Sequence, residues 1–236
     1  MKRLLALFLI LVFADAVLAA GQAELVAPGG GEMDLNRNII RYFGTEAQPA
    51  VVNWEDLSIE AKHLEYDRNQ GIVTGKEKVK LTQRNPLRIL ECAQLTIELN
   101  RNFLTATGNV NLRYDQQTTG TANHLEWDRV GQNVRLTEKP EIAYQEWHIS
   151  GEQMEAQLER GIFSASGRAQ IIGNDTVAKA GRIVFERDAE KAVMRENPIV
   201  VRGTNELSAT EIIYDFRTKK LSANGEVRTR IIKDKQ

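Results

Sequence analysis

The stretch SATEIIYDFRTKKLSANGEV, residues 208–227, contains the features that decide the fold. A small residue, Ala209, is followed three positions later by Ile212 and two positions after that by Tyr214. A polar turn, DFRTKK, comes next, and a return segment with a glycine, NGEV, closes the unit. Apolar and polar residues that alternate in this way are typical of a β-strand with one buried face. The stretch therefore predicts a strand, a turn and a return strand.

The same order of residues occurs six times along the chain. Each copy begins with a small residue, at Ala61, Cys92, Ala122, Gly151, Ala180 and Ala209, with spacings of 31, 30, 29, 29 and 29 residues. Three positions later comes a large apolar residue, at Leu64, Leu95, Leu125, Met154, Ile183 and Ile212. Two positions after that a second column follows, at Tyr66, Ile97, Trp127, Ala156, Phe185 and Tyr214. A near-constant period of this size indicates repeated units that bury their apolar faces against their neighbours.

The second half of each unit alternates between two forms. Units two, four and six carry a glycine, in TGNVNL, SGRAQI and NGEVRT, whereas units three and five carry a proline, in EKPEIAY and ENPIVVR. The deeper period is therefore two units long. It explains why DLNRNIIRYFG, from Asp34, resembles ELNRNFLTATG, from Glu98. We interpret the first of these as the back half of a further unit whose front half is missing.

These units predict an elongated, all-β body built from about six repeats of ~30 residues. Each unit has room for about three short strands, and we expect two facing sheets with one strand per level in each. The small residue at the head of each unit has the opposite parity to the two large columns, so a bulge or bend must lie between them. The segment ISGEQMEAQLERG has a helical alternative, but its match to the columns favours a strand.

The N-terminus has the layout of a secretory signal peptide. Lys2 and Arg3 precede the unbroken apolar run Leu4–Phe13, and Val17 and Ala19 are small residues at cleavage spacing. The alternative, a retained membrane anchor, is disfavoured because ten apolar residues are too few for a helix to span about 30 Å of hydrocarbon.

The sequence therefore divides into four segments. We predict a signal peptide at residues 1–19, a flexible linker at 20–32, the repeat domain at 33–230 and a charged tail at 231–236. The linker is expected because AGQAELVAPGGGE contains three consecutive glycines and no apolar column.

Composition and motifs exclude several kinds of chemistry. The formal net charge of -1 argues against a protein held by nucleic-acid phosphates. The single cysteine, Cys92, rules out an internal disulfide. The three histidines, His63, His124 and His148, have no metal-ligand spacing, and no phosphate loop or serine elbow occurs. We predict no cofactor, no metal and no enzymatic activity.

Two columns of side chains allow a structural or a functional interpretation. Asp67, Asp128 and Asp215 stand where a strand meets its turn, and we expect each to cap that turn. The stripe of Tyr66, Trp127, Phe185 and Tyr214 is core if two sheets close on each other. If the sheets splay apart, the same stripe becomes a trough that can hold lipid.

At TGNVNL, ANHLEWDRVGQNVRLTEKPEI and SATEIIYDFRTKKLSANGEV the sequence resembles the LptA/OstA-like family of lipopolysaccharide-transport proteins. The resemblance implies an open, V-shaped β-jelly roll in the periplasm that takes part in outer-membrane biogenesis. It also implies end-to-end homo-oligomers between an inner-membrane transporter component and an outer-membrane barrel. Two positions depart from the pattern, Glu77 in place of a glycine and Ala156 in place of an aromatic residue, so we expect distortion or opening there.

The resemblance further implies that the interior grips the acyl chains of lipopolysaccharide or a related lipid. The residues expected to contact lipid are the interior columns and the alternating return strand of unit two. They are Leu64, Tyr66, Leu95, Ile97, Val110, Leu112, Leu125, Trp127, Ile183, Phe185, Ile212 and Tyr214.

Three alternatives to a bridge protein stay open at this point. The first is an LptC-like, membrane-anchored transporter component, which would retain its N-terminal helix. The second is a β-solenoid polysaccharide-active enzyme that uses the carboxylates of Asp128 or Asp215. The third is a purely structural or adhesive solenoid.

Overall fold

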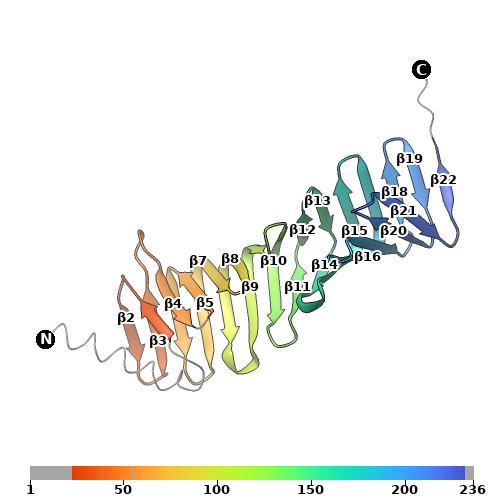
Figure 1. Cartoon of the computed structure of the whole chain (residues 1–236). Helices are drawn as coiled ribbons and strands as arrows, with labels where there is room; N and C mark the ends of the chain where they lie inside the picture. The colour runs from red at the N-terminus through yellow and green to blue at the C-terminus, as the bar shows by residue number, and fades with distance from the viewer. Residues whose placement is uncertain (1–22, 55, 232–236) are drawn as a thin grey trace. The chain divides into compact units, whose positions relative to one another are not determined.

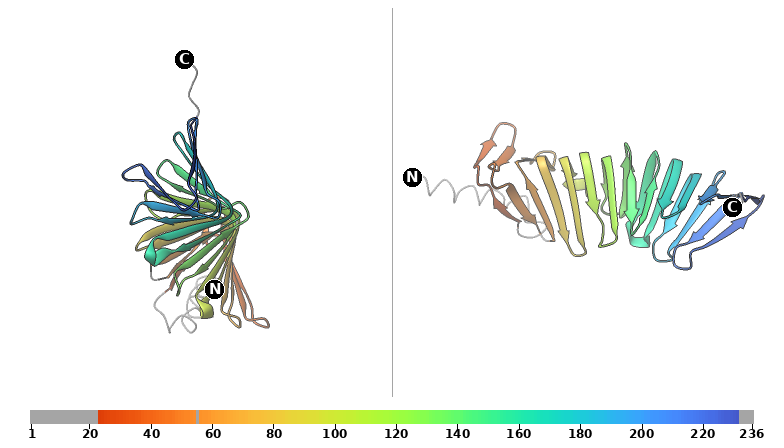
Figure 2. Two further views of the ribbon diagram at one scale, coloured as in Figure 1. Left: turned by 90° about the vertical axis from the view of Figure 1, so that its right-hand side faces the viewer. Right: turned by 90° about the horizontal axis from the view of Figure 1, so that it is seen from above.

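The structure is a computed structural model that describes residues 23–54 and 56–231 (Figure 1). The predicted signal peptide lies outside the described residues, and so does most of the charged tail. The described chain forms two compact units that meet at Thr107 and Gly108. All strand pairings given for both units are antiparallel, and the strands of each unit lie side by side (Figure 2). The predicted all-β jelly roll is confirmed.

The first unit contains two sheets, which we call wall A and wall B. Its strands are β1 (Ala23–Val26), β2 (Gly31–Asp34), β3 (Ile39–Phe43), β4 (Ala50–Trp54), β5 (Leu57–Ala61), β6 (His63–Asp67), β7 (Ile72–Arg84) and β8 (Leu87–Glu98), followed by the 3-10 turn η1 (Leu99–Arg101) and the start of β9 (Phe103–Arg113). Wall A runs β2–β3–β6 and continues into the first half of β7 and the second half of β8. Wall B runs β1–β4–β5 and continues into the remaining halves of β7 and β8.

The second unit repeats this plan with more strands. They are the end of β9, then β10 (Thr118–Asp128), β11 (Asn133–Thr137), β12 (Glu141–Tyr144), β13 (Trp147–Ser150), β14 (Gln153–Gln157), the 3-10 turn η2 (Leu158–Arg160), β15 (Ile162–Gly173), β16 (Thr176–Glu186), β17 (Lys191–Arg195), β18 (Ile199–Arg202), β19 (Asn205–Ser208), β20 (Glu211–Asp215), β21 (Lys220–Asn224) and β22 (Arg228–Arg230).

Within this unit the long strands β10, β15 and β16 belong to both walls. On wall A their halves pair with β11, β14 and β17, and β20 and β21 continue the wall from β17. On wall B the other halves pair with β12, β13 and β18, and β19 and β22 continue the wall from β18. Figure 1 shows β12, β13, β18 and β19 on one side of the unit and β11, β14 and β20 on the other.

The corner between the walls is made by residues with positive φ. Successive corners, at Glu77–Lys78, Gly108–Asn109, Glu138–Lys139, Gly167–Arg168 and Glu196–Asn197, each place two consecutive residues in the left-handed region, and a sixth begins at Gly225. The two residues face one residue of the partner strand, so the register shifts between Lys76 and Val79 and again between Ser166 and Ala169. This is the bend that the change of parity predicted.

The neighbouring strand closes each corner with a backbone hydrogen bond. The residue after the small column donates its N–H to the corner carbonyl, for example Lys62 to Glu77 at 3.0 Å and Gly181 to Glu196 at 2.9 Å. The backbone distortion expected at Glu77 does not occur. Glu77 and Lys78 adopt φ values of 62° and 55°, close to the 70° and 50° of Gly167 and Arg168 at an equivalent corner. Glu77 adopts the shared conformation without the glycine that favours it.

The aspartate column caps turns, as predicted. The Oδ1 atom of Asp67 accepts hydrogen bonds from the N–H groups of Asn69 and Gln70 at 2.9 and 3.0 Å. Asp128 and Asp215 make the same kind of bond to their own turns. These carboxylates have a local structural role.

The prediction of a flexible linker at residues 20–32 is wrong for residues 23–32, the part that the structure describes. Residues 23–26 form β1, which pairs with β4, and residues 31–34 form β2, which pairs with β3. The glycines make the turn between them, where Gly30 has a φ of +88° and Gly29 donates its N–H to the carbonyl of Phe43 at 2.8 Å. The sequence interpretation took these turn glycines as a sign of flexibility.

Opposite substitutions at two equivalent corners test the importance of the left-handed backbone. We expect Glu77→Gly to raise the free energy of unfolding by about 1 kcal/mol, because it removes the steric cost of the left-handed conformation. The ion pairs of Glu77 with Lys62 and His63 are exposed and offset little of this gain. We expect Gly167→Ala to lower it by about 1 kcal/mol. Urea denaturation measures both, and a shift of the same sign in both variants would contradict the shared geometry.

Candidate interior lipid site

All twelve predicted lipid-contact residues face the interior of their unit and are buried. Their exposed fractions run from 0% at Leu125, Ile183 and Ile212 to 9% at Tyr66. Ten of them lie on wall A. Val110 and Leu112 lie on wall B, in the β9–β10 hairpin that is closed by a hydrogen bond from the Tyr114 N–H to the Thr118 carbonyl.

The interior of wall A consists of two continuous apolar rows in the second unit. Cross-strand partners give the first row as Leu125, Leu136, Met154, Ala165, Ile183, Met194, Ile212 and Ala223, and the second as Trp127, Val134, Ala156, Phe163, Phe185, Ala192, Tyr214 and Leu221. The small residues of the second row lie beside large ones, Ala156 beside Phe163 and Ala192 beside Phe185. The expected opening at Ala156 does not occur, because Ala156 is buried and its neighbour is large.

Wall B contributes residues that the sequence interpretation missed. Ile142, Tyr144, Trp147, Ile149 and Ile171 face wall A and are all buried. The signal was the period-two alternation in EIAY and WHIS, which is short and is interrupted by the turn at residues 145–146. The interior is therefore lined from both sides.

An aromatic group, which we call the rim cluster, joins the two walls of the second unit at the edge away from the corner. Trp147 of wall B lies 5.2 Å from Tyr214 and 5.0 Å from Phe216 of wall A, measured between ring centroids. Tyr144 of wall B lies 5.0 Å from Phe185. Such tilted and edge-to-face pairs are favourable beyond the area that they bury. Phe216 was missed because it stands in a segment that resembles a polar turn.

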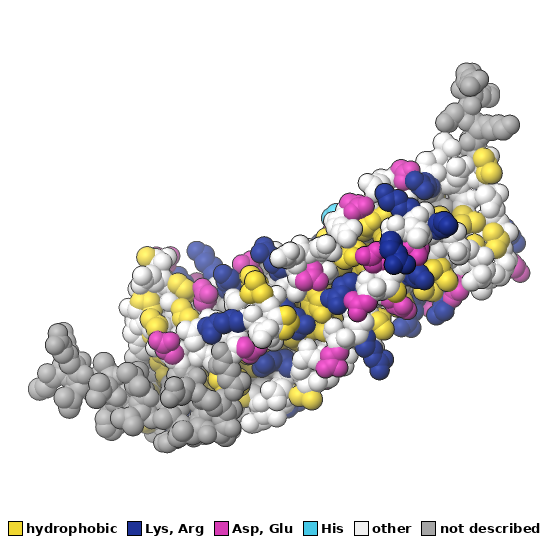
Figure 3. Space-filling view, in the orientation of Figure 1, with side chains coloured by type: hydrophobic (Ala, Val, Ile, Leu, Met, Phe, Trp, Pro, Cys, Tyr) yellow, Lys and Arg dark blue, Asp and Glu magenta, His cyan; other side chains and the backbone are white. Residues whose placement is uncertain are grey.

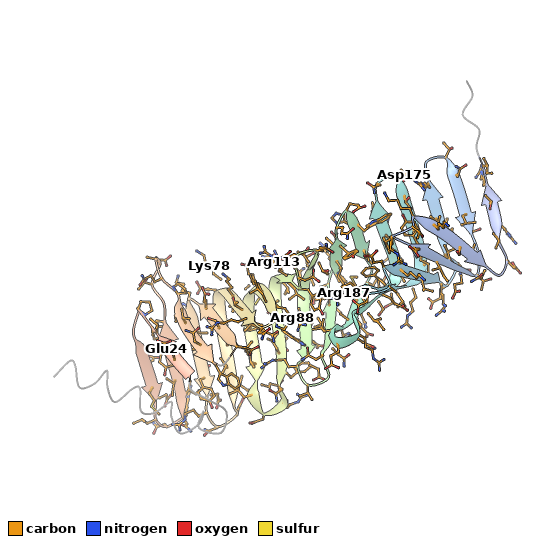
Figure 4. The ribbon with its side chains drawn as sticks, in the orientation of Figure 1. Glu24, Lys78, Arg88, Arg113, Asp175 and Arg187 are labelled. Atoms are coloured by element: carbon orange, nitrogen blue, oxygen red, sulfur yellow. The ribbon has the colours of Figure 1, made fainter. Side chains whose placement is uncertain are left out.

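A polar link supplements the rim cluster. The hydroxyl of Tyr114 donates a hydrogen bond to the carbonyl of Leu158 at 3.0 Å. The guanidinium of Arg187, which is labelled in Figure 4, lies 5.3 Å from the Tyr114 ring. Arg187 also pairs with Asp115 at 3.5 Å. Tyr114 and Asp115 end a hairpin of wall B, whereas Leu158 and Arg187 belong to turns of wall A, so the link spans the rim.

Burial raises the pKa of several titratable groups in the interior. It raises the pKa of Tyr42 to about 12 and raises the pKa of Tyr144 and Tyr214. It also raises the pKa of the Cys92 thiol to about 12, so the thiol stays protonated and is a poor nucleophile. Charged side chains instead lie on the outside, with apolar side chains between them (Figure 3).

The described residues hold no group of three or more His, Cys, Asp or Glu side chains that could ligate a metal ion. His63 and His148 are partly exposed and lie near Glu77 and Glu141, at 3.2 and 2.7 Å. In the part of the chain that is described, no helix has the length and hydropathy needed to cross a membrane.

The fold and the interior define a repeat-built β-jelly roll whose two walls enclose apolar side chains. Residues 58–162 match the family model described as "LptA/(LptD N-terminal domain) LPS transport protein". The match runs from β5 to the start of β15, and it confirms there the resemblance to the LptA/OstA-like family that the sequence shows.

Comparison with other proteins adds the following. No curated protein matches the chain. Among solved structures the chain is similar to LptH of Pseudomonas aeruginosa, described as the LptA homologous periplasmic component of the conserved lipopolysaccharide transport device. The identity is 13%, the match covers 50% of this chain and 96% of that chain, and the TM-score is 0.48.

A matched pair of truncations tests the energetic weight of the interior contacts. Phe185 is 1% exposed and contacts aromatic rings of both walls. We expect Phe185→Ala to lower the free energy of unfolding by about 3–5 kcal/mol. Phe43, which contacts His63 of the adjacent strand, is the control. Its truncation should cost less than about 1.5 kcal/mol, because the ring is only partly buried. Equal losses in chemical denaturation would contradict the assignment of Phe185 to the interface between the walls.

Proposed function

We propose that the protein is a non-enzymatic periplasmic component that carries lipopolysaccharide toward the outer membrane by holding its acyl chains between walls A and B. The observation that carries the proposal is the pair of apolar rows that continue across successive strands of wall A. The family match at residues 58–162 supports lipopolysaccharide, or a related lipid, as the cargo.

Acyl chains have to compete with the contacts that the walls already make. Burying one CH₂ group is worth about 0.8 kcal/mol, so a chain of about twelve carbons gains at most ~10 kcal/mol before the costs of ordering it. The interior is filled by buried side chains, and a bound chain must therefore replace wall-to-wall contacts. The rim is the edge that can part, because side-chain contacts join it, whereas the corner is continuous backbone.

The repeat also supports movement of the cargo. Each strand of wall A offers two apolar positions in the same register, so neighbouring strands are similar sites for an acyl chain. A lipid can then pass from level to level without a large barrier. This transfer requires no covalent chemistry.

The structure disfavours the enzyme alternative. A parallel β-solenoid is excluded for the described strands, since they pair antiparallel. The carboxylates of Asp128 and Asp215, on which that alternative depended, accept hydrogen bonds from their own turns.

We further propose that copies of the chain associate end to end through their terminal strands, and that the chain ends also meet an inner-membrane transporter component and an outer-membrane barrel. Among the described strands, β1 and β2 each have one neighbour, and so do β21 and β22. A strand with one free edge can accept a strand from another chain. The N-terminal strands carry Glu24, Glu32 and Asp34, whereas the C-terminal strands carry Lys220, Arg228 and Arg230. This charge difference favours head-to-tail contact.

Photocrosslinking tests the lipid path. A crosslinking residue at position 127 or 185, which faces the interior, should capture lipopolysaccharide in cells. A crosslinking residue at position 126 or 186, which faces outward on the same strands, is the matched control and should not. Immunoblotting of the adducts for lipopolysaccharide reads the result. Equal labelling on the two faces would contradict an interior path.

Charge reversal tests the end-to-end contact. The double variant Arg228→Glu/Arg230→Glu should shift light-scattering masses toward the monomer, because like charges then face each other. Adding Glu24→Lys and Glu32→Lys to the same chain should restore the association. The wild-type contact should weaken as salt rises. Unchanged masses for the double variant, for the compensated variant and for the wild type at raised salt would contradict the end-to-end contact.

A further inference from the structure

The strands of wall A have a constant length between the corner and the rim. In the second unit, each wall A pairing from β10–β11 to β20–β21 joins five residues of one strand to five of the next. The wall A pairings from β3 to β8 in the first unit also contain five residue pairs. On wall B of the second unit the pairings contain three to five. On wall A, the distance from corner to rim is therefore the same at successive strands.

The corner closes the bottom of the interior with backbone. At the corner between β14 and β15, the N–H of Glu152 donates to the carbonyls of Ser166 and Gly167 at 3.0 and 2.9 Å. A Cβ atom added to Gly151 at the same corner would lie 2.9 Å from the carbonyl oxygen of Ser166, so not even a methyl group fits there without a shift. A ligand that enters between the walls cannot pass the corner.

The rim, in contrast, borders polar turns that are in contact with water. Asp175 lies in the β15–β16 turn of wall B and Asp188 in the β16–β17 turn of wall A, and both side chains are exposed. A charged headgroup is costly to bury without partners, whereas acyl chains are stabilised by burial. We therefore expect a lipid that binds here to keep its headgroup at the rim and to point its chains along the strands toward the corner.

We propose that the distance from rim to corner sets an upper limit on the acyl-chain length that the interior covers. This inference rests on the proposed function and specifies which lipids the same interior favours. Strand residues rise by about 3.3 Å each, so the five residues of a wall A strand give a depth of about 16 Å. An extended chain advances by about 1.1–1.2 Å per bond, as in an extended polypeptide, so this depth covers about 14 carbons.

Chain length therefore acts in two regimes. Up to about 14 carbons, each added CH₂ group enters the interior and raises the affinity by at most about fourfold. A longer chain leaves its additional carbons at the rim, in water, and gains little from them. Because the five-residue length recurs at successive strands, the same limit applies wherever the lipid binds along wall A of the second unit.

A series of lipids that differ only in chain length tests the limit. The probes are lysophosphatidylcholines with octanoyl, decanoyl, dodecanoyl, tetradecanoyl, hexadecanoyl and octadecanoyl chains. Binding to the full chain is measured by tryptophan fluorescence below the aggregation concentration of each probe. The affinity should rise at each step up to tetradecanoyl and then change by less than about twofold in total. Partition of the same probes into dioleoylphosphatidylcholine vesicles is the control and should keep rising through octadecanoyl.

Photolabelling tests the orientation on which the limit depends. Two tetradecanoyl probes carry a diazirine, one at the penultimate carbon and one next to the carboxyl group, and mass spectrometry locates the adducts. The first probe should label first-row residues near the corner, such as Leu125 and Ile183. The second probe should label Trp127, Phe185 and Trp147 near the rim.

The outcomes separate the length limit from lipid binding itself. An affinity that kept rising by the same factor beyond tetradecanoyl would overturn the limit while leaving an interior lipid site intact. Adducts of both probes that were spread equally between the two rows would also overturn it. Adducts confined to outward residues such as Arg182 and Glu186, or no binding of any probe, would overturn the proposed function as well.

Discussion

The pair of left-handed residues at each corner is the constraint on which the rest of the structure depends. Side chains alternate along a strand, so a long strand that simply bent would point its apolar residues outward on one of the two walls. Two residues facing one, as at Glu77–Lys78 and Gly167–Arg168, let the partner strand change parity, from Cys92 to Leu95 and from Ala180 to Ile183, so that the apolar side chains of both halves stay in the interior. The repeated corner thus aligns the apolar rows of wall A with those of wall B.

The resulting interior is a core and a candidate lipid site at the same time. Leu125, Ile183 and Ile212 have the burial of ordinary core residues. The backbone joins the two walls at the corner. At the rim of the second unit, side chains such as Trp147, Phe216 and Tyr114 hold the walls together. In our proposal these contacts protect the interior when no lipid is present and part when acyl chains enter.

Much of the fold could be predicted from the sequence, because the six copies of the unit can be aligned with one another and the shared positions stand out. The columns at Leu64, Leu125 and Ile183 are buried as the repeat implies, and the aspartate column caps its turns. The repeat did not reveal features that occur once. Trp147 and Phe216 meet only through tertiary contact across the walls, and β1 lies in a segment whose glycines suggested a linker. Glu77 departs from the glycine pattern in sequence but keeps the corner geometry, because the strands around it fix the backbone.

The central claim is that the walls of the second unit part at the rim when lipid binds. Spin labels at Asn174→Cys, in the β15–β16 turn of wall B, and Ala189→Cys, in the β16–β17 turn of wall A, report on this distance in a Cys92→Ala background. Pulsed electron paramagnetic resonance should show a longer distance after lipopolysaccharide is added. An unchanged distance distribution in protein that has bound lipopolysaccharide would contradict the account.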